Sequence, residues 1–191
     1  MKLINGILAA AALSASLSVE AASVNFSVDP SLTTINGLGQ TFSVNILGDF
    51  NADDAENLLG GSLDLFYDSS ILNVVSVNVT APQDIAVANG TVNNATGVVD
   101  TMGFSTFAGV NGDFSFATIE FVTVGLGDSL LSLADANDMV FNFYSDKPPF
   151  GAPVDVYTTG ANVSVVPVPA AIWLFGSALL AGAGLLRRKQ K

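Results

Sequence analysis

The chain has 191 residues, half of them hydrophobic, and carries 17 acidic against six basic side chains, a formal net charge of −11. It contains no cysteine and no histidine. This composition excludes disulfide bonds, a Ser-His-Asp triad, a cysteine nucleophile and a zinc site of the usual type. Paired carboxylates are the remaining catalytic device, and no feature of the sequence singles out such a pair. We therefore expect that the protein is not an enzyme.

The first 21 residues have the layout of a secretory signal peptide. Lys2 precedes a mostly apolar run over residues 3–17. Val19 and Ala21 lie three positions and one position before the expected cleavage point, which follows Ala21. A retained N-terminal anchor is the alternative interpretation.

Residues 22–166 are expected to form one domain, an all-β, antiparallel jelly-roll-like sandwich. Hydrophobic and polar residues alternate over short segments that Gly, Asn, Asp and Pro separate, the pattern typical of such folds. The positions that should face the core are Phe42, Val44 and Ile46; Leu63, Leu65 and Tyr67; Ala117, Ile119, Phe121 and Thr123; and Met139, Phe141 and Phe143.

Three details of this pattern make separate predictions. The segment 71–79 should be buried on both sides, since hydrophobic residues occupy both alternating sets, Leu72 and Val74 in one and Val75, Val77 and Val79 in the other. Asn89-Gly90 predicts a tight hairpin turn, and Asn111-Gly112-Asp113 predicts another turn.

The order of these segments resembles the cohesin domain. The resemblance is carried by "LLGGSLDLFYDSSILNVVSVNV" at 58–79, where Asp68 to Ser70 turn the chain before Ile71 and Leu72 enter the core, and by "FATIEF" at 116–121. It implies a cohesin-like sandwich over residues 24–165. It also implies a dockerin-type protein receptor, because cohesins bind dockerin modules through one sheet face. The sequence does not mark which residues would form that face.

The segment "DFNADDAEN" gathers oxygen-bearing side chains. Asp49, Asn51 and Asp53 occupy the first, third and fifth positions of a calcium loop, and Glu56 follows. The pattern then fails, because Asp54 stands where glycine is needed and the twelfth position lacks a glutamate. Two interpretations stay open: an acidic connecting loop, or a weak calcium site built from these four ligands. We expect no other cofactor.

The domain is strongly acidic. Sixteen of the 17 acidic residues lie in residues 22–166, against one basic residue, Lys147, which gives a formal charge of −15. A surface of this sign repels nucleic acid, which we exclude as a partner. A carbohydrate-binding module is an alternative function, because many sandwiches present aromatic rings to sugars. The candidate rings are Phe50, Phe66, Tyr144, Phe150 and Tyr157.

The C-terminus carries an apolar run with basic residues behind it. Residues 170–186 contain no charge and follow Pro167 and Pro169, which cannot lie inside a helix. A helix over this run would be about 26 Å long, which is just enough to cross a bilayer. Trp173 suits the membrane interface, and Arg187 and Arg188 should hold their end in the cytoplasm. A buried C-terminal helix is the alternative, but the run lacks a polar face.

The sequence "VPVPAAIWLFGSALL" with Arg187, Arg188 and Lys189 behind it resembles the PEP-CTERM sorting signal of Gram-negative bacteria. The similarity begins at Val166, the sorting signal is expected over residues 167–191, and Val168 stands where the family motif has glutamate. The resemblance implies recognition by an exosortase-type membrane protease, an inner-membrane intermediate, and final placement at the cell surface or in the extracellular matrix. We therefore expect an exported, surface-sorted sandwich with a structural or interaction role in the envelope or exopolysaccharide matrix. Its partner would be a polysaccharide or an envelope protein.

Overall fold

The structure is a computed structural model that describes residues 22–52, 56–136, 142–148 and 151–168. All regular secondary structure in these ranges is β-strand, so the expected all-β class is confirmed. The strands are β1 (Ser23–Asp29), β2 (Leu32–Asn36), β3 (Thr41–Asn51), β4 (Leu58–Phe66), β5 (Leu72–Val79), β6 (Ala86–Asn93), β7 (Val98–Val110), β8 (Gly112–Thr123), β9 (Gly127–Asp135), β10 (Tyr144–Ser145), β11 (Ala152–Pro153), β12 (Asp155–Thr159) and β13 (Ala161–Val166).

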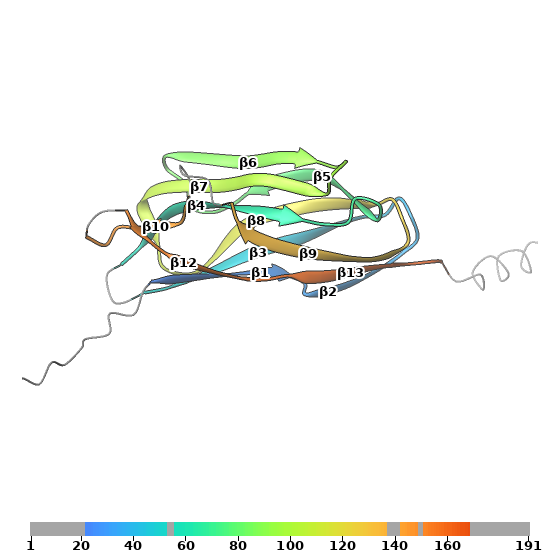
Figure 1. The fold of residues 1–191 in the computed structure, drawn as a ribbon, viewed down its shortest axis with the longest axis horizontal. Coiled ribbons are helices and arrows are strands. Elements are labelled where there is room, and N and C mark those ends of the chain that lie inside the picture. Colours follow the sequence, from blue (N-terminus) through green and yellow to red (C-terminus); the bar gives the residue numbers. More distant parts are fainter. Residues whose placement is uncertain (1–21, 53–55, 137–141, 149–150, 169–191) are drawn as a thin grey trace, which may run out of the picture.

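The strands form two sheets that pack face to face (Figure 1). One sheet has five strands in the order β12-β1-β3-β8-β5. The other has eight strands; its main run is β6-β7-β4-β9-β13-β2, and β10 and β11 lie beside the start of β4. Described strand pairs are antiparallel except β1 with β12 and β13 with β2. The predicted antiparallel sandwich is thus confirmed.

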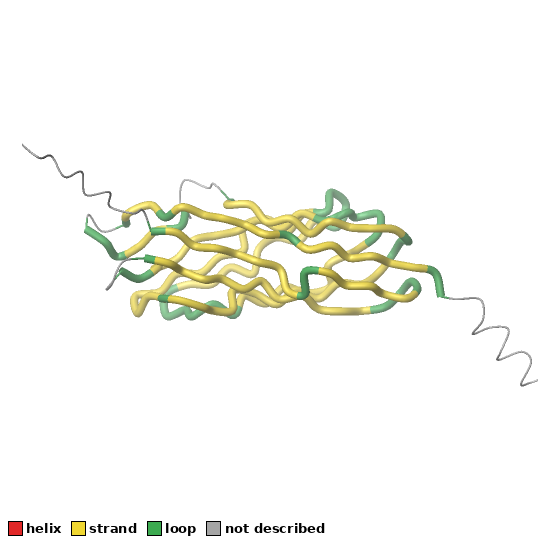
Figure 2. The backbone as a smooth tube through the Cα atoms, turned by 90° about the horizontal axis from the view of Figure 1, so that it is seen from below, coloured by secondary structure: helices red, strands yellow, loops and turns green. Residues whose placement is uncertain are grey.

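The body is elongated, and the described chain enters and leaves it at opposite ends (Figure 1). Ser23 at the start of β1 pairs with Asn51, the last residue of β3. The N–H of Gly37, in the loop just before β3, donates to the carbonyl of Val166 at the end of β13, at 2.8 Å. The length of β3 separates these two ends by about 35 Å. We call them the entry end and the exit end, and Figure 2 shows loops gathered at both.

The core forms where the alternation predicted it. Val44 and Ile46 in β3 are fully buried, and so are Leu63 and Leu65 in β4. The predicted inward set of β8, which consists of Ala117, Ile119, Phe121 and Thr123, is buried as well. Phe143 is buried, whereas Met139 and Phe141 lie outside the described residues.

An aromatic cluster joins the two sheets near the entry end. The ring of Phe26 in β1 lies 5.2 Å from that of Phe116 and 5.0 Å from that of Phe143. Phe104 in β7 contacts Phe116 from the other sheet, with a centroid distance of 6.1 Å in edge-to-face geometry. Such pairs add to the stabilisation that burial of the rings already provides.

The turn predicted after Tyr67 is present at the exit end. The Asp68 carboxylate accepts hydrogen bonds from the N–H of Ser70 at 2.8 Å and from its hydroxyl at 2.6 Å. The N–H groups of Ile71 and Leu72 both donate to the Asp68 carbonyl. Ile71 and Leu72 then enter the core, as expected. The predicted turn at Asn111-Gly112 is also confirmed, because it joins β7 to β8.

Two of the predicted details are wrong, one at a β-bulge in β5 and the other within the regular pairing of β6 with β7. The register of β5 against β8 shifts between Val74 and Ser76, so Val75 turns to solvent instead of sharing a buried face with Val77 and Val79. Asn89-Gly90 lies inside β6 and makes no hairpin turn. Gly90 takes a φ of 78° opposite Thr101, whose φ is 58°, and the hairpin instead turns over residues 94–97.

Asparagine side chains close the side of the sandwich where β5 and β6 face each other. The side-chain amide oxygen of Asn89 accepts a hydrogen bond from the backbone N–H of Val79 at 2.9 Å. Asn94 accepts the N–H of Val74 at 2.7 Å and donates to the Val74 carbonyl at 3.0 Å, and its oxygen also accepts the Tyr67 hydroxyl at 2.6 Å. These bonds satisfy backbone groups along the outer edge of β5, which would otherwise be open to pairing with another chain.

Candidate interaction surface

The outer face of the eight-stranded sheet is the candidate functional surface. Asp64, between the buried Leu63 and Leu65, and Phe66, after Leu65, point outward from β4. Phe66 pairs with Val98 on one side and with Ser132 of β9 on the other. The strand register therefore assembles this face from segments that are far apart in the sequence.

Two carboxylates meet on this face at the bulge in β7. The Thr101 N–H, which the bulge frees from the ladder, donates to Asp64 at 2.8 Å, and the Thr101 hydroxyl donates to Asp100 at 3.0 Å. Burial raises the pKa of Asp64, and the negative charges of Asp100 and Asp135 raise it further, against the opposing effect of the Thr101 hydrogen bond. A cationic partner group would relieve this repulsion.

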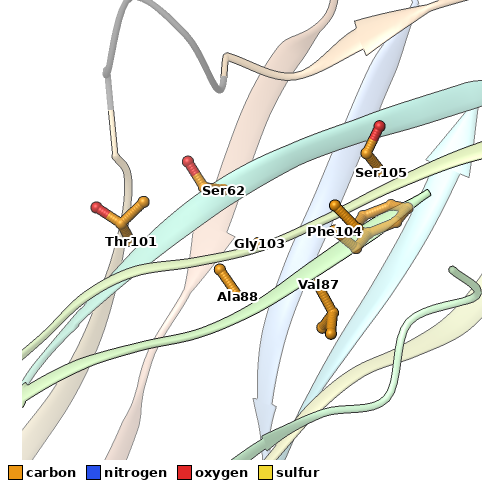
Figure 3. A pocket seen from close by; sticks show the side chains of 8 residues that line it. Ser62, Val87, Ala88, Thr101, Gly103, Phe104 and Ser105 are labelled. Atoms are coloured by element: carbon orange, nitrogen blue, oxygen red, sulfur yellow. The ribbon is translucent and has the colours of Figure 1, made fainter.

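Thr101, which bonds both carboxylates, also lines a hollow of about 190 Å³ (Figure 3). Small side chains and a glycine create it, because Ala88 of β6 stands opposite Gly103 of β7 and Ala86 stands opposite Ser105. The other lining residues are Ser62, Val87, Thr101 and Phe104. None of the lining residues is a carboxylate, and the wall is mostly apolar.

An exposed phenylalanine stands beyond the hollow toward the entry end. Leu58 pairs with Val110 and Gly60 with Ser105, so residues 106–109 bulge out of the sheet opposite one residue of β4. Phe107 in this bulge is 78% exposed, more than the other large hydrophobic residues described. The Asp84 carboxylate fixes the bulge by accepting the N–H of Phe107 at 2.6 Å and that of Ala108 at 3.2 Å. These bonds also lower the pKa of Asp84.

The outer face of the five-stranded sheet is different in kind. Its polar side chains pair with one another across strands. Thr118 donates to Asn45 at 2.9 Å, and Ser76 donates to Glu120 at 3.3 Å. Because these polar side chains already hydrogen-bond to one another, this face has fewer groups available to bind a ligand than the hollowed face of the other sheet.

The predicted calcium ligands are only partly brought together. Asp49 and Asn51 lie in β3 at the entry end, joined by a 2.9 Å hydrogen bond, and Asp53 lies outside the described residues. Glu56 is buried: it accepts the Ser145 hydroxyl at 2.5 Å and pairs with Lys147 at 3.2 Å. Among the described residues no group of three or more acidic side chains could hold a metal. The calcium site stays a prediction.

The same region holds a second carboxylate contact. Asp146 accepts the side-chain N–H of Asn57 at 2.9 Å and its backbone N–H at 2.8 Å. Both bonds lower the pKa of Asp146. Together with the Glu56–Lys147 pair, they fasten the chain before β4 to the β10 region.

The candidate sugar-binding rings do not gather into one platform. Phe50 is buried in the core, so it was wrong to expect it at a surface. Phe66 and Tyr157 are exposed, but they belong to different sheets. Tyr144 is half-buried with its hydroxyl 2.9 Å from that of Ser105, and Phe150 lies outside the described residues.

The sorting-signal residues fall at the edge of the described chain. Pro167 is exposed just after β13, while Pro169, Trp173, Arg187 and Arg188 lie outside the described residues, as does the predicted signal peptide. Across the described ranges, no helix has the length and hydropathy that membrane crossing requires. The predicted span over residues 170–186 is beyond those ranges.

Comparison with known proteins identifies the fold. No family model matches the chain, and no curated protein matches it in sequence. Solved cohesin structures do match. The seventh ScaB type I cohesin of Pseudobacteroides cellulosolvens aligns with a TM-score of 0.55 at 18% identity, over 77% of this chain and 94% of that one. A non-cellulosomal cohesin of the archaeon Archaeoglobus fulgidus aligns at 0.51 and 18%, over 77% and 94%.

A third match was solved with its partner. The third ScaC cohesin of Acetivibrio cellulolyticus, in complex with the ScaB dockerin, aligns at a TM-score of 0.53 and 17% identity, over 75% of this chain and 99% of that one. At these identities the matches show the fold alone. The cohesin-like sandwich expected from the sequence is confirmed.

Proposed function

We propose that residues 22–166 are a non-enzymatic protein-interaction module that docks its partner on the outer face of the eight-stranded sheet. The observation that carries the proposal is the hollowed, acidic face on a cohesin-like fold. The ScaC cohesin, which has the same fold, was solved with a dockerin bound. The dockerin-type receptor is therefore the form of the hypothesis that the comparisons favour.

Charge defines the chemistry of the partner. The Glu56 carboxylate binds Lys147, the only basic side chain between residues 22 and 166. The surface of the domain is consequently acidic or neutral, and the Asp64–Asp100 pair adds a focused negative charge beside the hollow. A protein surface with an apolar projection flanked by Lys or Arg fits this face.

An enzymatic role has little support in this geometry. The hollow contributes no titratable side chain, and Asp64 already uses one oxygen to hold the Thr101 N–H. A carbohydrate-binding module also has less support, because the exposed rings of Phe66 and Tyr157 lie on different sheets.

The docking face can be tested with two matched pairs of substitutions. Phe66→Ser with Asp100→Asn changes the proposed face, and Val75→Ser with Glu120→Gln changes the opposite face by the same chemistry. Immobilised residues 22–166 should capture a protein from the culture supernatant of the source organism. Capture should be lost in the first variant and kept in the second. Equal capture by both variants, or binding of polysaccharide alone, would refute the proposal.

We further propose that the chain is exported and sorted through its C-terminus by an exosortase-type protease, as the resemblance of residues 167–191 implies. The mature domain would then be a component of the cell surface or the exopolysaccharide matrix. Replacing Arg187, Arg188 and Lys189 with uncharged residues should disturb retention or processing. Mass spectrometry of surface-located protein tests the cleavage step, because an intact C-terminus there would contradict it.

A further inference from the structure

The exit end of the domain carries a group of exposed aliphatic side chains. Leu38, Val124, Leu126 and Val168 are 53%, 41%, 51% and 41% exposed. They come from three separate segments: the β2–β3 loop, the β8–β9 loop and the residues after β13. We call these four residues the exit patch.

Hydrogen bonds between the segments hold the patch at one end of the body. The N–H of Gly39 donates to the carbonyl of Thr123 at 2.8 Å, and the Thr123 hydroxyl donates to the carbonyl of Gly37 at 3.0 Å. The N–H of Gly37 donates in turn to Val166. A Cβ on Gly37 would lie 2.9 Å from a methyl group of Val168, so the glycine makes room for that side chain. The apolar surface is therefore built into the fold.

Negative charge is concentrated at the entry end, opposite to the exit patch. Six described carboxylates lie at the entry end: Asp49, Glu56, Asp84, Asp113, Asp146 and Asp155. Asp68 and Asp128 lie at the exit end, and Glu120 lies close to it, opposite Ser43 near the start of β3. The Asp68 carboxylate is bonded to Ser70, and that of Glu120 to Ser76. More of the described carboxylates therefore lie at the entry end than at the exit end, where the chain leaves the domain.

The sequence indicates what lies next to the exit patch. The apolar run 170–186 begins two residues after Val168, so about 7 Å of extended chain separates the patch from the expected membrane segment. Whatever surface that run enters must lie against this end of the domain.

We propose that the exit patch rests on the lipid bilayer and seats the domain on the membrane while the C-terminal run is inserted. The four aliphatic side chains contact the interfacial region, and the acidic entry end points away from the membrane. This contact is separate from the docking face, which lies on the side of the sandwich. It rests on the insertion of residues 170–186, which the sequence predicts.

The experiment uses residues 22–191, the chain left after the predicted signal peptide is removed, in phosphatidylcholine vesicles that carry a nitroxide on the lipid chains near the headgroup. Because the chain has no cysteine, a single one can be introduced and labelled with an environment-sensitive fluorophore. Leu38→Cys places the label in the exit patch, and Asp113→Cys places it at the entry end. The label at 38 should be quenched severalfold more than the label at 113. Equal quenching, or no association with vesicles, would overturn the proposal.

A second arm separates the patch from the mere tether. Leu126→Asp and Val168→Asp, each made in the Leu38→Cys background, should release the label from the lipid while the protein still floats with the vesicles. Val75→Asp, a matched change of an exposed valine on the sheet, should leave the quenching unchanged. If the label stays quenched in both patch variants, the tether alone explains the proximity and the proposal fails. The patch variants should leave partner capture by the docking face intact, so the two proposals can fail independently.

Discussion

Replacing Asn94 with alanine would open the closure between β5 and β6. The side chain of Asn94 makes three hydrogen bonds, two with the backbone of Val74 and one with the hydroxyl of Tyr67. Val74 and Tyr67 are both buried, so water cannot readily replace the lost partner. A net hydrogen bond contributes about 1 kcal/mol, and a buried group left unsatisfied costs about 1–3 kcal/mol. We expect Asn94→Ala to lower the free energy of unfolding by roughly 2–4 kcal/mol.

Urea unfolding of residues 22–166, followed by circular dichroism, measures this loss. Asn78→Ala is the control, because Asn78 lies exposed on β5, the strand that contains Val74, and it should change stability by about 0.5 kcal/mol or less. Tyr67→Phe should cost about 1 kcal/mol, and its effect should largely disappear in the Asn94→Ala background. A loss below about 0.5 kcal/mol for Asn94→Ala, or full additivity with Tyr67→Phe, would refute the reasoning.

Three further outcomes follow from other contacts. Gly97→Ala should destabilise the fold by about 2–4 kcal/mol, because Gly97 has a φ of 73° and an added Cβ would clash with a backbone carbonyl oxygen. Gly112→Ala is the control: Gly112 has a φ of 72° but open space around it, so the change should cost about 1 kcal/mol in the same urea assay. The depressed pKa of Asp146 adds stability that is fully present above the ordinary carboxyl pKa and is lost as pH falls through the folded value, so Asp146→Asn should cost about 1 kcal/mol at pH 7 and much less at pH 2. Millimolar calcium should raise the melting temperature more than sodium chloride of the same ionic strength does, because calcium at ten times Kd adds about 1.4 kcal/mol to the free energy of unfolding. Asp49→Ala with Asp53→Ala should abolish this extra stabilisation. Equal melting curves in the two salts would rule out the calcium site.

Much of the fold could be predicted because period-two alternation survives wherever the ladder is regular. Ala117, Ile119 and Phe121 show this in β8, where every predicted inward position is buried. The prediction failed where one extra residue enters a strand. The bulge at Val75 reverses the faces after it, and nothing local to the sequence announces which partner strand will force the shift. Gly90 has the positive φ that Asn-Gly suggests, but it uses that φ within a strand.

The candidate surface was harder to predict, because strand register is a tertiary property. Asp64 and Asp100 are 36 positions apart and meet only because β4 pairs with β7 around the Thr101 bulge. Phe107 was not among the residues predicted at the surface, and the bulge that exposes it is held by the Asp84 carboxylate. A weak signal was present: Phe107 lies three positions after the buried Phe104, an odd step, which in a regular strand places the two rings on opposite faces.

The ion pair of Lys147 with Glu56 has a consequence for resistance to proteases. Trypsin-like proteases cut after Lys or Arg, and residues 22–166 offer them this one lysine. Its ammonium group is held against a buried carboxylate, and Pro148 follows it, which hinders cleavage of that peptide bond. The whole domain should therefore pass intact through digestion by such enzymes even when its loops are accessible. For a domain that is exported, as we propose, this scarcity of cleavage sites would give durability among secreted proteases.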